Sequence, residues 1–317
     1  MNKKVKIIIS VTVVVILIAA SIGYIHYVSG LKAKGTIITI NTGYNSTPMD
    51  RIVSLDPAAT ATLYGLGAYK DLVGGNSYDM YPPNETLPNV TDYPSMDISQ
   101  IINLRPQAVI SFTNYSAGQI SELLDAGIDY IFLNSGSGSG MKIIEKQNTL
   151  LGELTGTERN ATLINQWMNT SLKDLRNNAT KMANNSPVNG FYYSSRDSLW
   201  TAGNNTFINQ YFYYSDIVNI AENHSGFYQI SPGNIVSSSP QIIFLDYYIN
   251  TSRLNETPFA NTPAVEDKNF YVTPEYAFDE PDFRDIYMIQ WMVDRAYGNV
   301  TIPQFPIKLK YNPDPLS

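Results

Sequence analysis

The chain has 317 residues, 15% of them charged, with a formal net charge of −7 and no cysteine. The negative charge disfavours nucleic acid as a partner, and the missing cysteine excludes both disulfides and lipid attachment through a cysteine. The length is enough for one large domain or for two lobes.

The N-terminus predicts a membrane anchor. Three lysines precede an uncharged apolar run from Ile7 to about Tyr27, which is long enough for a spanning helix. The lysines place the N-terminus in the cytoplasm and the remaining chain outside the cell. A cleaved signal peptide is the alternative, but its apolar region is normally only about 7–15 residues long. We therefore predict a cytoplasmic tip and transmembrane anchor over residues 1–28 and a short spacer over residues 29–34.

Asn-x-Ser/Thr sequons are more frequent than chance. The chain carries thirteen, whereas its composition gives roughly five by chance. The excess predicts a glycoprotein with its bulk on the outer cell surface, and the missing lipid-attachment cysteine favours an archaeal source. The sparsely charged surface would lose few ion pairs in an acidic medium. The sequons lie at Asn45, Asn84, Asn89, Asn114, Asn160, Asn169, Asn178, Asn184, Asn204, Asn223, Asn250, Asn255 and Asn299.

Strand and helix patterns alternate over residues 35–140 and predict an N-terminal α/β lobe. Strands that alternate with helices at this spacing form parallel sheets with helices on both faces. The predicted strands are 35–40, 51–55, 71–74, 108–112 and 130–133, and the predicted helices are 58–66, 98–104 and 120–126.

The second half of the chain predicts a connecting helix and another α/β lobe. Residues 141–185 are mostly helical in pattern and contain no proline, although Gly152 and Gly156 could break the helix locally. Residues 186–317 form the C-terminal lobe, and no second pair of crossovers between the lobes is predicted. Its predicted strands are 190–193, 241–246 and 269–272, and its predicted helices are 207–220 and 282–297.

Four segments carry a resemblance to a known family. They are Arg51–Thr60 with Leu63–Gly67, Ile101–Ile110, Leu199–Ile208 and Ser238–Ile243. Their order and spacing resemble the substrate-binding proteins of ABC importers for cobalamin and ferric siderophores, which are class III periplasmic binding proteins. The resemblance implies two Rossmann-like lobes with parallel sheets, a long connecting helix and a ligand in the cleft between the lobes. It also implies an ABC permease and its ATPase as partners.

One departure from the family pattern concerns docking. The resemblance implies a glutamate on each lobe that meets arginines of the permease, but the matching positions hold Ser99 and Gly233. Asp97 could replace the first glutamate. Docking is therefore expected at Asp97, Ser99 and Gly233 without the usual pair of salt bridges.

A cleft for a large flat ligand needs aromatic walls and a few fixed polar groups. Such residues follow the predicted strands, at whose C-terminal ends open α/β sheets bind ligands. Asp56 is interpreted mainly as a helix cap, and Arg196 and Arg284 either as partners of anionic ligand groups or as surface ion pairs. The alternative to a cleft role is that the aromatic residues lie in the core or on the glycan-covered surface. The candidates are Asp56, Tyr78, Tyr81, Phe112, Tyr115, Tyr193, Arg196, Trp200, Asp246, Tyr247 and Arg284, with Tyr248 beside them.

Catalysis, metal binding and a cofactor are not predicted. The two histidines are His26, beside the apolar run, and His224, inside a sequon, and no His, Cys or paired-carboxylate cluster has ligand spacing. No P-loop or Gly-x-Ser-x-Gly motif is present. The carboxylates of residues 279–285 are interpreted as the solvated N-terminal end of the last helix.

These observations predict an anchored, monomeric receptor that captures a metal chelate, either cobalamin or a ferric siderophore, for an ABC importer. The alternative is a cell-surface sensor or structural glycoprotein that keeps the fold but does not take part in transport. The sequence does not distinguish between the two chelates.

Overall fold

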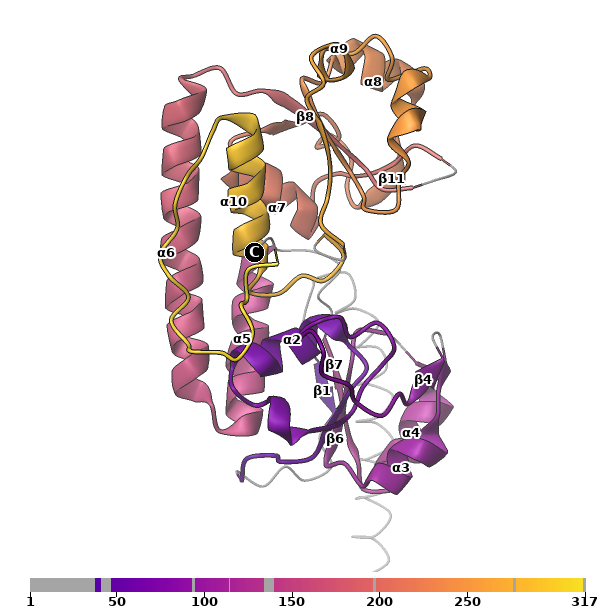
Figure 1. The fold of residues 1–317 in the computed structure, drawn as a ribbon. Coiled ribbons are helices and arrows are strands. Elements are labelled where there is room, and N and C mark those ends of the chain that lie inside the picture. The colour runs from indigo at the N-terminus through magenta and orange to yellow at the C-terminus, as the bar shows by residue number, and fades with distance from the viewer. Residues whose placement is uncertain are drawn as a thin grey trace, which may run out of the picture.

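The computed structural model describes residues 38–40, 47–92, 95–113, 115–133, 140–195, 198–275 and 278–315. Within these residues, two separate β-sheets form the centres of two lobes, and a pair of long helices lies alongside both (Figure 1). The predicted α/β class is therefore confirmed. The predicted anchor, residues 1–28, lies outside the described residues, and in the described part no helix has the length and apolar character needed to cross a membrane.

The N-terminal sheet has the order β1-β7-β6-β2-β3. Strand β1 runs antiparallel to β7, so the prediction of an entirely parallel sheet is wrong at this edge. An edge strand pairs on one side only, and antiparallel edges on parallel sheets are common. The strands are β1 (Ile38–Ile40), β2 (Ile52–Ser54), β3 (Leu72–Gly74), β6 (Ala108–Ser111) and β7 (Asp129–Phe132).

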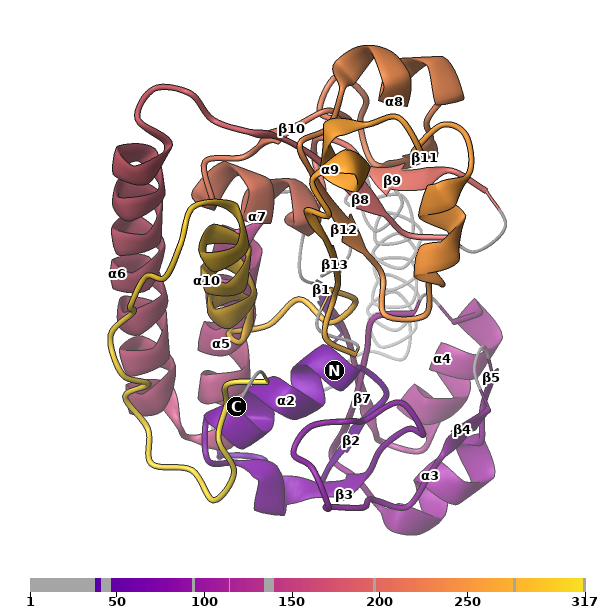
Figure 2. The same cartoon turned by 45° about the horizontal axis from the view of Figure 1, so that its top comes forward.

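Helices cover both faces of this sheet, as predicted (Figure 2). Helix α2 (Pro57–Gly65) packs on one face, while α3 (Ile98–Leu104) and α4 (Ala117–Asp125) pack on the other. Eight of the nine residues of α2 are buried, because α5 covers the side of α2 that faces away from the sheet. The lobe also contains the short helix η2 (Tyr69–Asp71) and the hairpin of β4 (Thr91–Asp92) and β5 (Ser95–Met96).

The predicted single connecting helix over residues 141–185 is instead two antiparallel helices, α5 (Met141–Thr155) and α6 (Glu158–Ala183). Gly156 ends α5 in the left-handed conformation, with φ of 66°. Gly152 lies inside α5, where an added Cβ would be 2.7 Å from the side chain of Ala161, so glycine allows the two helices to approach closely. The 26 residues of α6 span about 39 Å and run beside both lobes (Figure 1).

The C-terminal sheet is entirely parallel, in the order β10-β8-β12-β13. Helix α7 (Phe207–Tyr214) is shorter than the predicted helix 207–220, because Asp216 has φ of 53° and the chain then enters β10. The sheet consists of β8 (Asn189–Tyr193), β10 (Val218–Asn219), β12 (Ile242–Leu245) and β13 (Phe270–Val272). Sequence patterns missed the ribbon of β9 (Trp200–Ala202) and β11 (Phe227–Gln229), and also α8 (Pro232–Ser238), η3 (Thr251–Asn255) and α9 (Pro263–Glu266).

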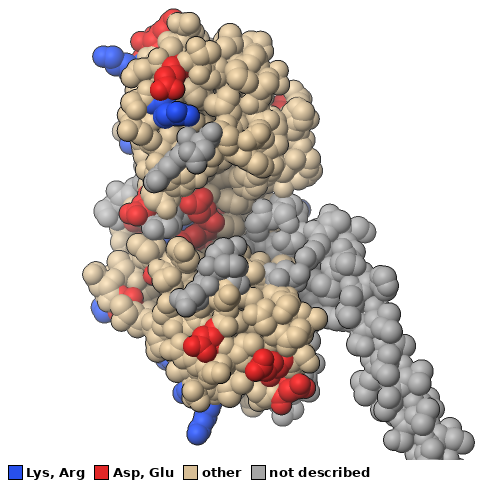
Figure 3. Space-filling model, turned by 90° about the vertical axis from the view of Figure 1, so that its right-hand side faces the viewer, with Lys and Arg blue, Asp and Glu red and all other residues tan. Residues whose placement is uncertain are grey.

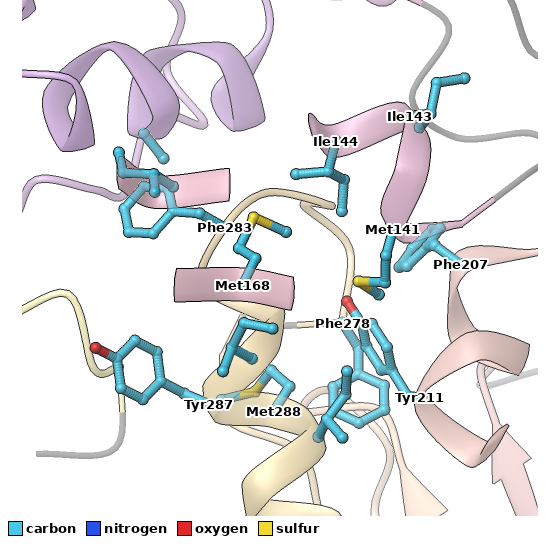
Figure 4. Packing of buried hydrophobic residues seen from close by; sticks show 14 of the residues in the cluster. Met141, Ile143, Ile144, Met168, Phe207, Tyr211, Phe278, Phe283, Tyr287 and Met288 are labelled. Atoms are coloured by element: carbon cyan, nitrogen blue, oxygen red, sulfur yellow. The ribbon is translucent and has the colours of Figure 1, made fainter. Parts of the chain in front are cut away.

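The last part of the chain returns to the N-terminal lobe, which the sequence did not predict. Helix α10 (Asp285–Ala296) packs on α6 and α7, and Phe283 before it lies against Gly65 of α2, where an added Cβ would be 2.5 Å from the ring. Further on, the amide of Tyr311 donates to the hydroxyl oxygen of Tyr64 over 2.7 Å. One buried cluster therefore joins the lobes, and Figure 4 shows Phe283, Met168, Met288 and Tyr211 within it.

Candidate functional site

A cavity of about 240 Å³ opens at the C-terminal ends of the parallel strands of the N-terminal lobe. This is the edge at which open α/β sheets bind ligands. Tyr78 and Phe112 are 50% and 42% exposed in its wall, whereas Tyr115 is buried beneath them. All lining residues are uncharged, so the cavity suits an apolar or amide-bearing group. The lining residues are Leu55, Pro57, Asn76, Tyr78, Thr91, Phe112 and Tyr115.

The C-terminal lobe presents a second aromatic surface on the ribbon of β9 and β11. Trp200 is 39% exposed and Phe227 is 44% exposed. Phe227 pairs with Ala202, and Trp200 pairs with Gln229, so Trp200 and Phe227 project from the same face of the ribbon. Figure 1 shows β11 on the side of this lobe that faces the N-terminal lobe. Each lobe therefore carries a pair of exposed aromatic side chains, Tyr78 and Phe112 on one and Trp200 and Phe227 on the other.

Two carboxyl groups of the C-terminal lobe lie next to each other near this space. Asp246 follows β12 and is buried. Its carboxylate accepts a hydrogen bond from the Tyr192 hydroxyl over 2.9 Å and from the amide of Tyr247 over 2.8 Å. Desolvation, together with the negative charge of Asp246, raises the pKa of Asp279 to about 7. Figure 3 shows acidic side chains gathered at the waist between the lobes.

Three predicted cleft residues lie away from the aromatic cavity. Tyr193 is 1% exposed and packs between Phe191 and Phe259 in the core of its lobe, because it projects from a central strand that is covered on both faces. Tyr81 is buried against Tyr64 and contacts the end of the chain rather than the aromatic cavity. Arg284 is discussed below. Arg196 lies outside the described residues.

Three of the four carboxyl groups that were interpreted as a solvated helix end are buried, which corrects that interpretation, whereas Asp279 is exposed. Asp282 is 0% exposed, and Glu280 and Asp285 are also buried. Helix α10 begins only at Asp285. Residues 280–283 are buried because the segment passes between the lobes, and sequence patterns carry no information about that contact.

Arg284 forms buried ion pairs with two carboxyl groups of this segment, so it is not the surface ion pair that was the alternative prediction, and it also lines a cavity of about 320 Å³. Its Nη2 lies 2.6 Å from Oδ2 of Asp282 and 2.9 Å from Oε2 of Glu280, and its Nε also contacts both oxygens of Asp282. The guanidinium carbon lies 4.7 Å from the centre of the Tyr81 ring. The adjacent negative charges raise the pKa of Arg284 despite burial.

Asp56 caps α2, as predicted from the sequence. Its Oδ1 accepts from the amides of Ala58 and Ala59 over 3.0 and 3.4 Å. Burial nevertheless raises its pKa to about 7, and the negative charges of Asp79 and Asp282 add to this effect. Burial also raises the pKa of Asp79 to about 6.

The residues at the predicted docking positions are accessible. Asp97 caps α3 by accepting from the amide of Gln100 over 2.9 Å, and Ser99 follows it on the exposed first turn. Gly233 is exposed on the first turn of α8. Both short helices therefore present their N-terminal ends to solvent, one on each lobe.

In the described part of the chain, no group of three or more His, Cys, Asp or Glu residues has a geometry suited to a metal ion. The ring of His224 packs 4.5 Å from that of Tyr228. Sequence reasoning missed Asn76, Thr91 and Phe227 as neighbours of the aromatic surfaces. Phe227 lies in a strand of only three residues, in which exposed and partly buried side chains alternate. A run this short gives a weak signal in the sequence.

Two α/β lobes with a candidate site between them define the architecture of a two-lobed solute-binding protein. A family model described as periplasmic binding protein matches residues 52–277. The chain belongs to this family.

Individual relatives support the assignment. An uncharacterised ABC transporter substrate-binding lipoprotein of Bacillus subtilis is 28% identical over 197 residues, which cover 61% of this chain and 62% of that protein. A cobalamin-binding protein of Halobacterium salinarum is 26% identical over 285 residues, covering 85% of this chain and 74% of that protein. Among solved structures, a periplasmic heme-binding protein from Pseudomonas aeruginosa has the same fold, with a TM-score of 0.69 at 18% identity over 81% of this chain and 96% of that one.

Proposed function

We propose that this protein is the extracellular receptor of an ABC importer and captures a metal chelate between its lobes. The observation that carries the proposal is the pair of aromatic surfaces. Tyr78 and Phe112 border an uncharged cavity on one lobe, and Trp200 and Phe227 project from the other. Such walls suit a large, flat ligand with an apolar or amide-bearing periphery.

Of the two chelates expected from the sequence, the geometry favours cobalamin over an anionic ferric siderophore. Among the residues that the structure describes, none that lines the aromatic cavity is charged, and Asp246 and Asp279 lie on the opposite lobe. Arg284, one of the two arginines predicted to meet anionic ligand groups, is already bound to Asp282 and Glu280. The Halobacterium relative, a cobalamin-binding protein, supports the same choice.

Calorimetric titration of the purified protein with cobalamin, hemin and ferric siderophores tests this function. We expect cobalamin to bind with a Kd of about 1 μM or tighter. Phe112→Ala should weaken that affinity by about tenfold, because it removes an aromatic wall worth roughly 1–2 kcal/mol.

The matched control is Val236→Ala, which truncates an exposed side chain on α8 and should leave the Kd unchanged. If no chelate binds below about 1 mM, the receptor function is refuted and the non-transporting surface protein becomes the better explanation. An equal loss of affinity in both variants would remove Phe112 from the site.

We further propose that the receptor works as a membrane-anchored monomer that docks on a permease through the ends of α3 and α8. Asp97, Ser99 and Gly233 are exposed there. Only one of the three carries charge, so docking should depend weakly on ionic strength. The tether over residues 29–34 would keep the cleft close to the permease in the same membrane.

The proposed glycosylation gives a prediction that depends on burial. Eight sequon asparagines are exposed, whereas Asn160 is half-buried and its amide donates to the carbonyl of Leu66 over 2.8 Å. Mass spectrometry of glycopeptides from the native source should therefore find glycan at exposed positions such as Asn169 and Asn255, and none at Asn160. Glycan at Asn160, or none at any exposed sequon, would contradict this expectation. The exposed sequons are Asn84, Asn89, Asn169, Asn184, Asn223, Asn250, Asn255 and Asn299.

A further inference from the structure

Carboxyl groups from both lobes meet in the junction between them. Asp56 and Asp79 belong to the N-terminal lobe, at the start of α2 and in the loop after β3. Glu280, Asp282 and Asp285 belong to the segment that leaves the C-terminal sheet after β13 and reaches α10. The negative charges of Asp79 and Asp282 raise the pKa of Asp56, and the same two charges raise the pKa of Glu280. Like charges therefore oppose each other across the junction.

Neutralisation within this group is incomplete. Arg284 makes most of its contacts with Asp282 and one further ion pair with Glu280. Three carboxyl oxygens remain buried without a hydrogen-bond partner, namely Oδ2 of Asp56, Oδ1 of Asp79 and Oδ2 of Asp285. The other oxygen of each group accepts a backbone hydrogen bond, from Ala58, Asn76 and Asp282 respectively. A buried carboxylate whose second oxygen has no partner is unfavourable, and such a group holds its proton instead. The missing hydrogen-bond partners are therefore found in addition to the clustering of the carboxyl groups.

Other groups also face the cluster. Thr60 of α2 lies beside Asp79, and Tyr211 of α7 lies beside Asp285. Burial raises the pKa of Tyr81 and of Tyr211, so both hydroxyls stay neutral over the physiological range. A cavity of about 320 Å³ borders the junction, and Glu275 and Asp314 line it together with Glu280, Arg284 and Asp285. Arg284 is the positively charged residue in this set of groups.

We propose that this junction is a proton-operated clamp between the lobes. When its carboxyl groups are protonated, they hold the segment of residues 278–285 against the N-terminal lobe. When they ionise, repulsion across the junction releases the segment and the lobes move apart. The use of this clamp in ligand capture and release rests on the proposed function, whereas the clamp itself does not.

The pH range follows from the direction of the pKa shifts. Burial raises the pKa of Asp79 to about 6, of Asp56 to about 7 and of Glu280 to about 8. Unfolded carboxyl groups titrate near pH 4. Groups with raised pKa stabilise the closed junction at low pH, and this stabilisation is lost as the pH rises through the folded values. The clamp should therefore be closed near pH 5 and open near pH 8.

The distance between the lobes measures the clamp directly. The chain contains no cysteine, so Ser99→Cys on α3 and Ser237→Cys on α8 place one spin label on each lobe of the full-length protein in detergent. Pulsed electron paramagnetic resonance without ligand should show a longer distance at pH 8 than at pH 5. Combining Glu280→Gln with Asp79→Asn should keep the short distance at pH 8, because the repelling charges are removed.

Glu222→Gln is the control, since Glu222 is exposed and outside the junction. It should respond to pH like the parent protein. The same distance at pH 5 and pH 8 overturns the clamp, and so does a pH response that survives the double substitution. Because the measurement uses no ligand, failure to bind cobalamin would refute the proposed function without affecting this result.

Discussion

Arg284→Met is expected to lower the free energy of unfolding by about 3–5 kcal/mol at pH 7.5, because it leaves the buried carboxylate of Asp282 without its cation and removes the hydrogen bond to Glu280. Methionine keeps much of the length and apolar contact of the arginine stem, so lost packing contributes little. Urea unfolding followed by circular dichroism measures the change.

Low pH should reduce this loss. A buried acid that has lost its cation can be protonated in acidic solution, which lowers the penalty at pH 4 to about 1–2 kcal/mol. The matched control is Arg253→Met, which breaks an exposed ion pair with Glu256 at 3.6 Å. That change should cost less than about 0.5 kcal/mol at either pH. A similar loss for Arg284→Met at pH 4 and pH 7.5 would contradict the electrostatic explanation.

Asp56→Asn is expected to stabilise the protein at pH 8 and to have little effect at pH 4. The pKa of Asp56 is raised from 3.8 to about 7, so the unfolded state binds fewer protons than the folded state between these values. Ionisation of the buried group therefore lowers stability as the pH rises through about 7. A shift of this size corresponds to at most about 4 kcal/mol, of which we expect about 1–2 kcal/mol to be recovered, since asparagine remains polar.

Asparagine also caps helices well, so the hydrogen bonds to Ala58 and Ala59 should survive. The control is Asp97→Asn, the same substitution at the exposed cap of α3. Thermal unfolding at pH 4 and pH 8 should show a higher Tm for Asp56→Asn at pH 8 alone, and no pH-dependent difference for Asp97→Asn. A lower Tm for Asp56→Asn at pH 8 would mean that the carboxylate is stabilised by a partner other than the helix amides.

Sequence patterns predicted an element reliably where the residues of that element alone determine its structure. Helix α3 was predicted at its observed bounds, because Asp97 supplies a cap and the apolar residues have helical spacing. The buried strands β2, β6 and β12 were found for the same reason, since short runs of β-branched and apolar residues mark strands covered on both faces. The family resemblance added the two-lobed arrangement, and Tyr78, Phe112 and Tyr115 were placed on one cavity.

The sequence alone therefore determined the α/β class, the family and the N-terminal aromatic wall. Tertiary structure decided the rest. Whether 141–185 is one helix or two depended on whether α5 and α6 pack closely at Gly152. The acidic segment before α10 looked like a solvated helix end, yet it is buried because Phe283 fixes it against Gly65 in the other lobe. Burial of charge depends on contacts between residues more than 200 positions apart, such as Gly65 and Phe283, and no local pattern records such a contact.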